Sequence, residues 1–227
     1  MKICLLSIAI LLLAVSPGRA DQIVNGSFEN FVVGPHDVDF GTFLRLFSPP
    51  PNTDITGWTI SGSSGGNPNS VDLVHSSLYP AFAGTQSLDM EGAVGASGVI
   101  FQSFATTPGD EYDLSFEYAN NPFGRGATMN VLVTGAGTLL NQNVSHNSSI
   151  VSMDYKLFSQ DFTADSGTTT LTFSAITNSG FGIALDAVSV VPAAAPTPEP
   201  STFIMFVLGL CTLGFLRPRK AMTLVNA

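Results

Sequence analysis

The stretch EYDLSFEYA, residues 111–119, alternates apolar and polar side chains without a break. One face of it collects the apolar side chains Tyr112, Leu114, Phe116 and Tyr118. A period of two residues is typical of a β-strand that buries one face and exposes the other. This pattern constrains the fold most, because no amphipathic helical period of useful length occurs between the two ends of the chain.

Segments of the same kind recur through the middle of the chain, separated by turn signals such as TPGD and DSG. Strands are expected over 42–47, 56–61, 70–75, 86–91, 98–105, 111–119, 127–133, 155–163, 168–176 and 182–191. Many short strands without helices favour an all-β sandwich, specifically a jelly roll. They exclude a parallel α/β architecture, whose sheet needs helices to cover it.

The apolar register changes within the last of these segments, GIALDAVSVV. Ile183 and Leu185 occupy odd positions, whereas Val188 and Val190 occupy even ones. Because a slip of one residue exchanges the faces of a strand, a β-bulge or bend is predicted at Asp186-Ala187.

The first 20 residues have the layout of a secretory signal helix. Lys2 precedes an apolar run over 3–15, and small residues, Gly18 and Ala20, come before a cleavage point at Asp21. The alternative, a membrane anchor, is disfavoured because the run is shorter than the ~20 residues needed for a span.

Charge and cysteine usage separate the middle from the ends. Residues 21–197 hold three basic side chains, Arg45, Arg125 and Lys156, and 16 acidic ones, a formal net charge of −13. Such a surface repels nucleic acid, which requires clustered Lys and Arg. Both cysteines, Cys4 and Cys211, lie near the ends, so a disulfide framework within the middle is excluded.

The C-terminal segment combines a Pro-rich linker over 192–200, an apolar run and a basic cluster, within a span of 201–220, and a short tail over 221–227. The run is long enough for a transmembrane helix, and the positive-inside rule places the cluster in the cytoplasm. The order of these parts is carried by Pro198, Glu199, Pro200, Arg217, Arg219 and Lys220. It resembles the PEP-CTERM sorting signal, although such signals usually end close after the basic cluster.

That resemblance implies processing by an exosortase, passage through the membrane, and delivery to the cell surface or its exopolysaccharide. A second resemblance covers nearly all of 22–191 through the pieces IVNGSFE, TGWTISG, SVDLV, GTQSLDMEG, IFQSFATTPGDEYDLSFEYA, FTADSGTTTLTFSA and LDAVSVV. In their order and spacing these are similar to the choice-of-anchor C type of exported domain, which resembles the galactose-binding-like jelly rolls. The likeness implies a two-sheet sandwich associated with carbohydrate or the cell wall, and no known chemistry.

The galactose-binding-like resemblance also implies a structural Ca²⁺ site. It would place the opening loop beside the closing strand, so that Asn25, Ser27 and Glu29 meet Asp186. Carboxylate and carbonyl oxygens are the ligands that Ca²⁺ prefers. The alternative is that Asn25-Gly26 is only a turn and Glu29 is solvated.

A sugar-binding face is the second candidate site. Trp58, the single tryptophan, offers a ring that could stack on a pyranose, although one Trp in a sandwich is more often a core residue. Loop residues are better candidates for hydroxyl recognition. The loop candidates are Tyr79, Phe82, Asn120, Asn121 and Arg125.

The motifs that could indicate catalysis are each better explained in another way, so we do not expect the chain to be an enzyme. The GSSGG stretch at 62–66 fits G-x-S-x-G, but no helix follows to build the nucleophile elbow. Asp89 and Glu91 are two residues apart on one strand. An acidic outer face is a simpler interpretation of this spacing than a glycosidase pair. His36, His75 and His146 show no metal-ligand spacing.

The sequence therefore predicts a non-enzymatic exported protein that associates with exopolysaccharide or cell-envelope carbohydrate. A structural matrix or adhesion protein that binds other proteins is the alternative. A third hypothesis is a glycan hydrolase. It requires two carboxylates that face each other across a cleft, or a Ser–His pair within hydrogen-bond distance.

Overall fold

The structure is a computed structural model that describes residues 19–194, apart from 49, 62, 65–66, 95–97 and 148–151. The segment 1–18, most of the linker, Pro198-Glu199-Pro200 and the basic cluster lie outside the described residues. Within the described part, no helix is long and apolar enough to cross a membrane. The same residues contain no α-helix, so the fold is built from strands and loops.

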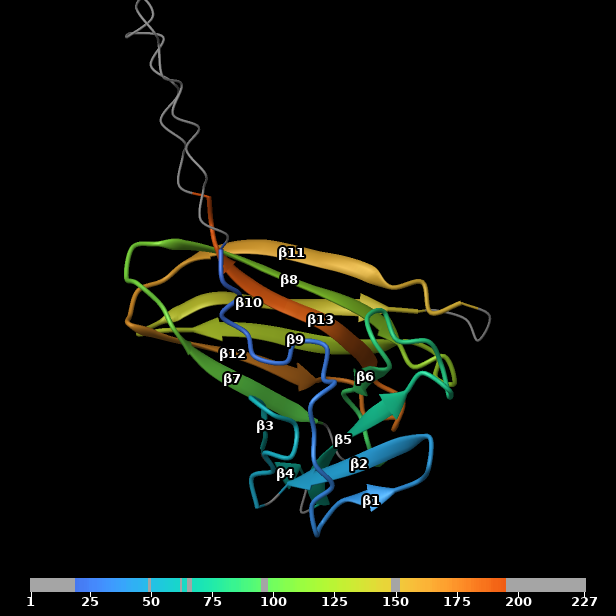
Figure 1. The fold of residues 1–227 in the computed structure, drawn as a ribbon. Helices are drawn as coiled ribbons and strands as arrows, with labels where there is room; N and C mark the ends of the chain where they lie inside the picture. The colour runs from blue at the N-terminus through green and yellow to red at the C-terminus, as the bar shows by residue number, and fades with distance from the viewer. Residues whose placement is uncertain are drawn as a thin grey trace, which may run out of the picture. The chain divides into compact units, whose positions relative to one another are not determined.

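The described residues form thirteen strands in two antiparallel sheets (Figure 1). One sheet has the order β1-β2-β5-β6-β13-β8-β11, with the short β4 added to β5, and the other has the order β10-β9-β12-β7-β3. The strand bounds are β1 Val38–Asp39, β2 Phe43–Ser48, β3 Thr59–Ile60, β4 Ser63–Ser64, β5 Asn67–His75, β6 Gln86–Asp89, β7 Val99–Ala105, β8 Glu111–Asn120, β9 Ala127–Thr134, β10 Thr138–His146, β11 Lys156–Thr163, β12 Thr168–Ala175 and β13 Ile183–Pro192. From β7 to β13 the chain passes repeatedly between the sheets, as it does in jelly rolls.

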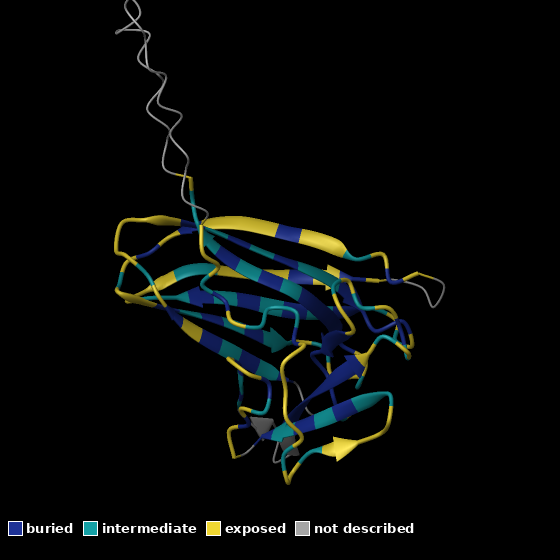
Figure 2. Cartoon of the chain, viewed as in Figure 1, coloured by how far each residue is buried: buried dark blue, intermediate teal, exposed yellow. Residues whose placement is uncertain are grey.

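The core lies between the two sheets, and it follows directly from the alternation in the sequence. On β8, Leu114 and Phe116 are fully buried, while Glu111 at its start is exposed. Phe116 stacks on Phe158 of β11 with ring centroids 4.5 Å apart and meets Phe173 of β12 edge-on at 5.1 Å. Figure 2 shows the resulting striped pattern along the strands, buried on one face and partly exposed on the other. The predicted all-β sandwich is confirmed.

The predicted strands agree with the observed ones except for the short strands β1 and β4, which were not predicted, and at two further places. The segment expected over 56–61 is a strand only at Thr59–Ile60, because Gly57 adopts a positive φ of 85° in the preceding turn. The strand β10 was not predicted. Its sequence TLLNQNVSH lacks alternation, and its burial pattern is that of a polar sheet edge.

The predicted bulge in β13 is confirmed. The pairing of β13 with β8 shifts register between Asp186 and Ser189, and Ala187 has a φ of +50°. Leu185 before the shift and Val188 after it are both buried, so the bulge returns the apolar side chains to the core.

The outer face of the larger sheet is covered at its centre by loops. A second apolar cluster forms there from Val74, Tyr79, Ala119, Met153 and Ala184. A cavity remains between these loops and strands β2, β5 and β6. Polar residues from the outer face of the sheet line this cavity.

Candidate functional site

A cavity of about 250 Å³ lies on the outer face of the larger sheet. We call it the outer-face cleft, and its lining consists of Phe43, Arg45, Asp72, Val74, Leu78, Asp89, Asn121, Phe123, Gly180 and Phe181. Strands β2 and β5 supply Phe43, Arg45, Asp72 and Val74, which alternate with core residues such as Leu44 and Leu73. The cleft therefore follows from the period of the strands, which turns alternate side chains away from the core.

An ion pair forms one part of the cleft floor. The Nε and Nη2 groups of Arg45 donate to Oδ1 and Oδ2 of Asp72, each at 2.7 Å. The side chains are 20% and 8% exposed. Burial raises the pKa of Asp72 above its ordinary value, although the hydrogen bonds and the charge of Arg45 lower it. The pair holds both side chains in one geometry, which is what a recognition site requires.

Asp89 forms the other part of the floor. Its Oδ2 accepts from Nδ2 of Asn121 at 2.7 Å, and its Oδ1 accepts from the backbone N–H groups of Glu91 and Gly182 at 2.9 and 2.8 Å. The residue is 1% exposed, and this burial raises its pKa to about 8 despite the three donors. Asp89 also stands directly opposite Asp72 in the register of β5 and β6, and like charges in that position repel each other.

Aromatic rings form two walls of the cleft. Phe43 stacks on Phe40 with ring centroids 4.6 Å apart, and the guanidinium carbon of Arg45 lies 5.4 Å from the Phe43 centroid. On the side of β8 and β13, Phe123 and Phe181 are 50% and 40% exposed. The cleft thus combines apolar walls with a few convergent polar groups, the usual composition of a small-molecule site.

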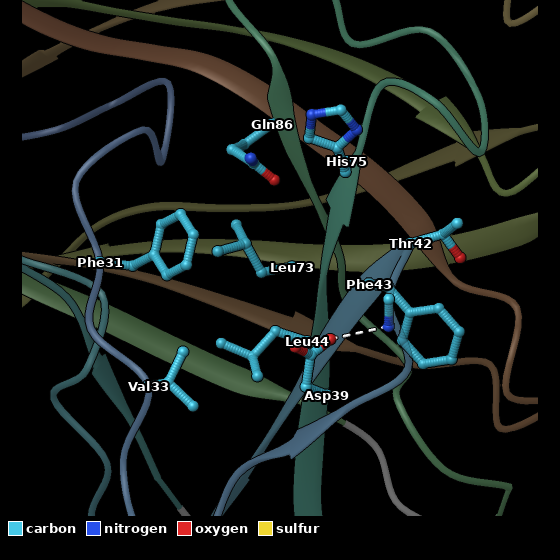
Figure 3. A pocket seen from close by; sticks show the side chains of 10 residues that line it. Phe31, Val33, Asp39, Thr42, Phe43, Leu44, Leu73, His75 and Gln86 are labelled. Atoms are coloured by element: carbon cyan, nitrogen blue, oxygen red, sulfur yellow. Dashed lines mark hydrogen bonds between the residues drawn. The ribbon is translucent and has the colours of Figure 1, made fainter.

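A second cavity of about 180 Å³ lies at the β1–β2 end of the larger sheet, and we call it the edge pocket (Figure 3). Phe31 and Val33 approach Leu44 and Leu73 across it, with His75 at its rim. It contains no cluster of hydrogen-bonded polar side chains comparable to the floor of the outer-face cleft. We therefore take the outer-face cleft as the candidate functional site.

The residues predicted to bind Ca²⁺ are brought to neighbouring places, but most of their oxygens are engaged. Gly26 packs against the backbone of Val188 so closely that a Cβ would collide with it, which places the opening loop beside the closing strand as predicted. Asn25 uses its side chain to bridge the backbones of Asn30 and Thr56. The structure describes Ser27 as partly exposed.

The two carboxylates hold one loop by its backbone. Glu29 accepts from the N–H groups of Thr85 and Gln86 at 2.7 and 2.8 Å. Asp186 accepts from Phe82 and Ala83, both at 2.9 Å, and its pKa is raised by burial to about 6. N–H donors at these oxygens do not fit a cation, and no group of three or more acidic, His or Cys side chains in the described residues is arranged for a metal. The Ca²⁺ site stays a prediction.

The residues predicted to bind sugar differ in their burial and in their location in the structure. Trp58 is 1% exposed, packs on Phe28 and Phe173, and donates from Nε1 to the carbonyl of Asn25 at 3.1 Å. This corrects its assignment to a binding face, because a buried ring has no surface for a ligand. The core alternative holds.

Among the loop candidates, Asn121 alone lines the outer-face cleft. Tyr79 is 4% exposed within the second apolar cluster, so its assignment to ligand contact is also corrected. Asn120 is fully buried and donates from Nδ2 to the carbonyl of Asn121 at 2.7 Å, which makes it a support rather than a contact. Arg125 is exposed and outside the cleft lining.

The acidic pair did not form an outer acidic face. Asp89 and Glu91 are 1% and 0% exposed, because the loops over the larger sheet cover them. His75 and Ser77 do form a hydrogen bond of 2.8 Å, but the N–H of Ser77 also donates to the same ring nitrogen, as in a local turn. The 62–66 stretch lies partly outside the described residues.

Most residues of the outer-face cleft were not identified from the sequence as candidate ligand-binding residues. Arg45 in FLRLF and Asp72 in SVDLV are single charges within apolar strands, and that pattern is the signal that could have revealed them. A charge at such a position must find a partner on the same face, since an unpaired buried charge is costly. Phe43, Phe123 and Phe181 gave no such signal, because exposed and buried phenylalanines look alike in a sequence.

Comparisons with known proteins give one family match and one related sequence. A family model described as "Protein of unknown function (DUF642)" matches residues 21–191. The chain is 30% identical over 206 residues to halomucin of Haloquadratum walsbyi, an alignment that covers 88% of this chain. The chain spans only 2% of the length of that curated relative.

Several solved structures are distantly similar. A CBM61 module in complex with β-1,4-galactotriose has a TM-score of 0.47 at 14% identity, covering 77% of this chain and 99% of that one. The tandem CBM22 domains of Paenibacillus barcinonensis Xyn10C also reach 0.47 at 14% identity, covering 83% and 49% of the two chains. At these TM-scores the likeness assigns no ligand, so an assignment depends on the chain's own side chains.

Proposed function

The chain belongs to the DUF642 family, and we propose that its sandwich domain is a non-enzymatic carbohydrate-binding domain of the cell surface. The observation that carries this proposal is the outer-face cleft, with aromatic walls over a hydrogen-bonding floor. At about 250 Å³ it is smaller than the ~300–1,000 Å³ of pockets for drug-sized ligands, which suits one sugar ring.

The chemistry of the walls and floor supports a sugar in particular. The C–H face of a pyranose packs on an aromatic ring, as the exposed rings of Phe123 and Phe181 allow. Its hydroxyls both donate and accept, so they match carboxylate acceptors such as Asp72 and the donors of Arg45. Because Asp72 and Arg45 already hold each other, little ordering is needed when the ligand arrives.

The proposed location rests on the sequence. The secretory signal over 1–20 and the PEP-CTERM-like segment from Pro198 onward support export, exosortase processing and a final place at the cell surface or in its exopolysaccharide. The net charge of −13 over 21–197 supports a soluble life there, away from nucleic acid.

A protein-binding adhesion role is the second candidate, and one surface favours it. From the end of the opening loop to the residue after β1, five apolar side chains are between 37% and 63% exposed, namely Phe31, Val32, Val33, Val38 and Phe40. Exposed apolar side chains that cluster in one segment often mark contacts with other proteins.

Glycan-array binding of the purified full chain tests the carbohydrate proposal. We expect binding, and Phe181→Ala should weaken it about tenfold, since loss of a stacked aromatic contact costs on the order of 1 kcal/mol or more. Leu157→Ala is the matched control, because Leu157 is 64% exposed on β11, outside the cleft lining. If no polysaccharide binds, including the host's own, the adhesion role replaces this proposal.

A further inference from the structure

Resting on the proposed carbohydrate role, we infer that the outer-face cleft takes a sugar with a free, protonated amine, for which Asp89 is the counter-charge. The lining of the cleft contains two carboxyl groups, Asp72 and Asp89, and one cationic side chain, Arg45. Arg45 is committed to Asp72 by two hydrogen bonds of 2.7 Å. Among the described residues, Asp89 accepts hydrogen bonds from neutral donors and is paired with no cation.

The imbalance continues behind the floor. Glu91 is 0% exposed, and its Oε2 accepts from the N–H groups of Ser179 and Gly180 at 2.6 and 3.0 Å. Its Oε1 is buried and has no hydrogen-bond partner among the described residues. Three buried carboxyl groups, Asp72, Asp89 and Glu91, therefore share one partly buried guanidinium, that of Arg45, in this part of the domain. Ionising a buried carboxyl group that has no cation beside it is costly, and a positive charge delivered by a ligand would offset part of that cost.

The walls suit the same ligand. The guanidinium carbon of Arg45 lies 5.3 Å from the Phe40 centroid and 5.4 Å from that of Phe43, so these ring faces already accommodate a cation. Phe123 and Phe181 offer two more rings on the other side of the cleft. An ammonium group enclosed by rings gains cation–π attraction that a neutral hydroxyl or acetamide at the same position does not.

Protonation of Asp89 is coupled to this binding. Without a ligand, burial raises the pKa of Asp89 to about 8, so at pH 6 the group is protonated. An ammonium beside it stabilises the carboxylate and lowers that pKa, so the amino sugar should release a proton on binding. The titratable and charged groups that act on Asp89 from the packed elements are Arg45, Asp72, Tyr79 and Tyr155, and Glu91 acts on it through its backbone N–H.

The test compares three sugars that differ only at carbon 2, using calorimetry on the full chain at pH 6. Glucosamine, N-acetylglucosamine and glucose carry an ammonium, an acetamide and a hydroxyl there, and the galacto series provides a second set. We expect an amino sugar to bind about tenfold more tightly than both of its neutral partners. Part of a proton per ligand should be released, measured from the heats in two buffers of different ionisation enthalpy.

The variant Asp89→Asn should bring amino-sugar affinity down to that of the neutral partner, while the neutral sugars change little. Asp161→Asn removes the same formal charge from an exposed position on β11 and should change neither. If Asp89→Asn does not fold, the proton release of the unmodified protein decides the question. An absence of that release overturns the inference.

The outcomes also separate this inference from the proposed function. Neutral sugars that bind as tightly as amino sugars overturn the amine preference and leave the carbohydrate role standing. Equal affinity for Nα-acetyl-lysine amide, which keeps its side-chain ammonium, overturns the amino-sugar preference as well. The cleft would then recognise lysine side chains. Failure of every glycan on the array, charged or neutral, removes the carbohydrate role itself.

Discussion

Asp89 occupies a position that a strand rarely gives to a carboxyl group. It is 1% exposed and faces Asp72 directly across β5 and β6. Its three donors, from Asn121, Glu91 and Gly182, compensate part of the desolvation, but no cationic side chain in the described part of the chain is bonded to it. A carboxyl group in this setting is easier to protonate than to ionise, and this makes the stability of the domain depend on pH.

The sign of that dependence follows from the two pKa values of Asp89. Its ordinary value is 3.8, and in the folded protein it is about 8. Between these values the folded state holds the proton and the unfolded state does not, so the free energy of unfolding falls as pH rises. The contribution is at most about 1.4 kcal/mol per pH unit. In Asp89→Asn the decline between pH 4 and 8 should be shallower, as measured by urea denaturation.

Asp161→Asn is the control for that experiment, because it removes an exposed aspartate from β11. Asp186, whose pKa is raised to about 6, adds a similar decline between pH 4 and 6 that remains in both variants. Equal slopes in the unmodified protein and Asp89→Asn would show that Asp89 is ionised in the folded state at neutral pH.

The sequence could identify only part of the site at this scale. Asn121 was predicted from its loop, since polar loop residues on a rigid scaffold often bind ligands. Trp58 was expected in the core more often than on a binding face, but the sequence alone leaves both places open to such a ring. Burial decides between them, and burial depends on which segments pack above a residue.

Strand β13 shows that an irregularity within a strand can be inferred from the amino-acid sequence alone. The exchange of apolar positions from odd to even within GIALDAVSVV locates one extra residue, and the register shift lies between Asp186 and Ser189. The bulge also frees the N–H of Val188 to donate to the carbonyl of Gly26 at 3.0 Å, which ties the opening loop to the last strand.

The bulge can be tested through Ala187, whose φ of +50° is a conformation that glycine adopts without strain. Ala187→Gly should leave the free energy of unfolding unchanged or raise it by about 0.5–1 kcal/mol. Ser189→Gly, two residues along in the regular part of β13, should lower it by about 0.5–1 kcal/mol. Thermal and urea denaturation measure both. A destabilisation by Ala187→Gly as large as that by Ser189→Gly would contradict the bulge geometry.

Strand β10 marks the limit of pattern at the scale of an element. Of its nine residues, Val144 and His146 are buried, and the strand is held to β9 by backbone pairing and contacts such as Asn130 Nδ2 to Asn143 Oδ1 at 2.9 Å. An edge strand with few buried side chains needs little apolar alternation, so its sequence resembles a loop.

At the scale of the whole domain, the chain enters and leaves at the same end of β13. Near the entry, Gln22 donates its N–H to the carbonyl of Val190 at 2.8 Å, and Pro192 pairs with Tyr112. The opposite end of β13, at Ile183, pairs with Asn120 beside the cleft. Ten residues of strand separate these ends, about 30 Å, so the cleft lies at the end of the sandwich opposite to the C-terminal end of β13.

Mass spectrometry of the mature protein from its own host tests the proposed processing. We expect an N-terminus at Asp21 and loss of the apolar run and basic cluster that follow Pro200. Recovery of the uncut polypeptide from the cytosol would contradict both the export and the sorting proposals.

The sequence by itself determined the fold class, most strands, the bulge and the acidic, cysteine-free character of the domain. These properties are local, since period, charge and turn chemistry are read from neighbouring residues. Only the tertiary structure decided where the cleft lies, because it joins Arg45, Asp72, Asp89 and Asn121 from separate strands and a loop. Their proximity results from sheet order, and many sheet orders are compatible with the same alternating segments.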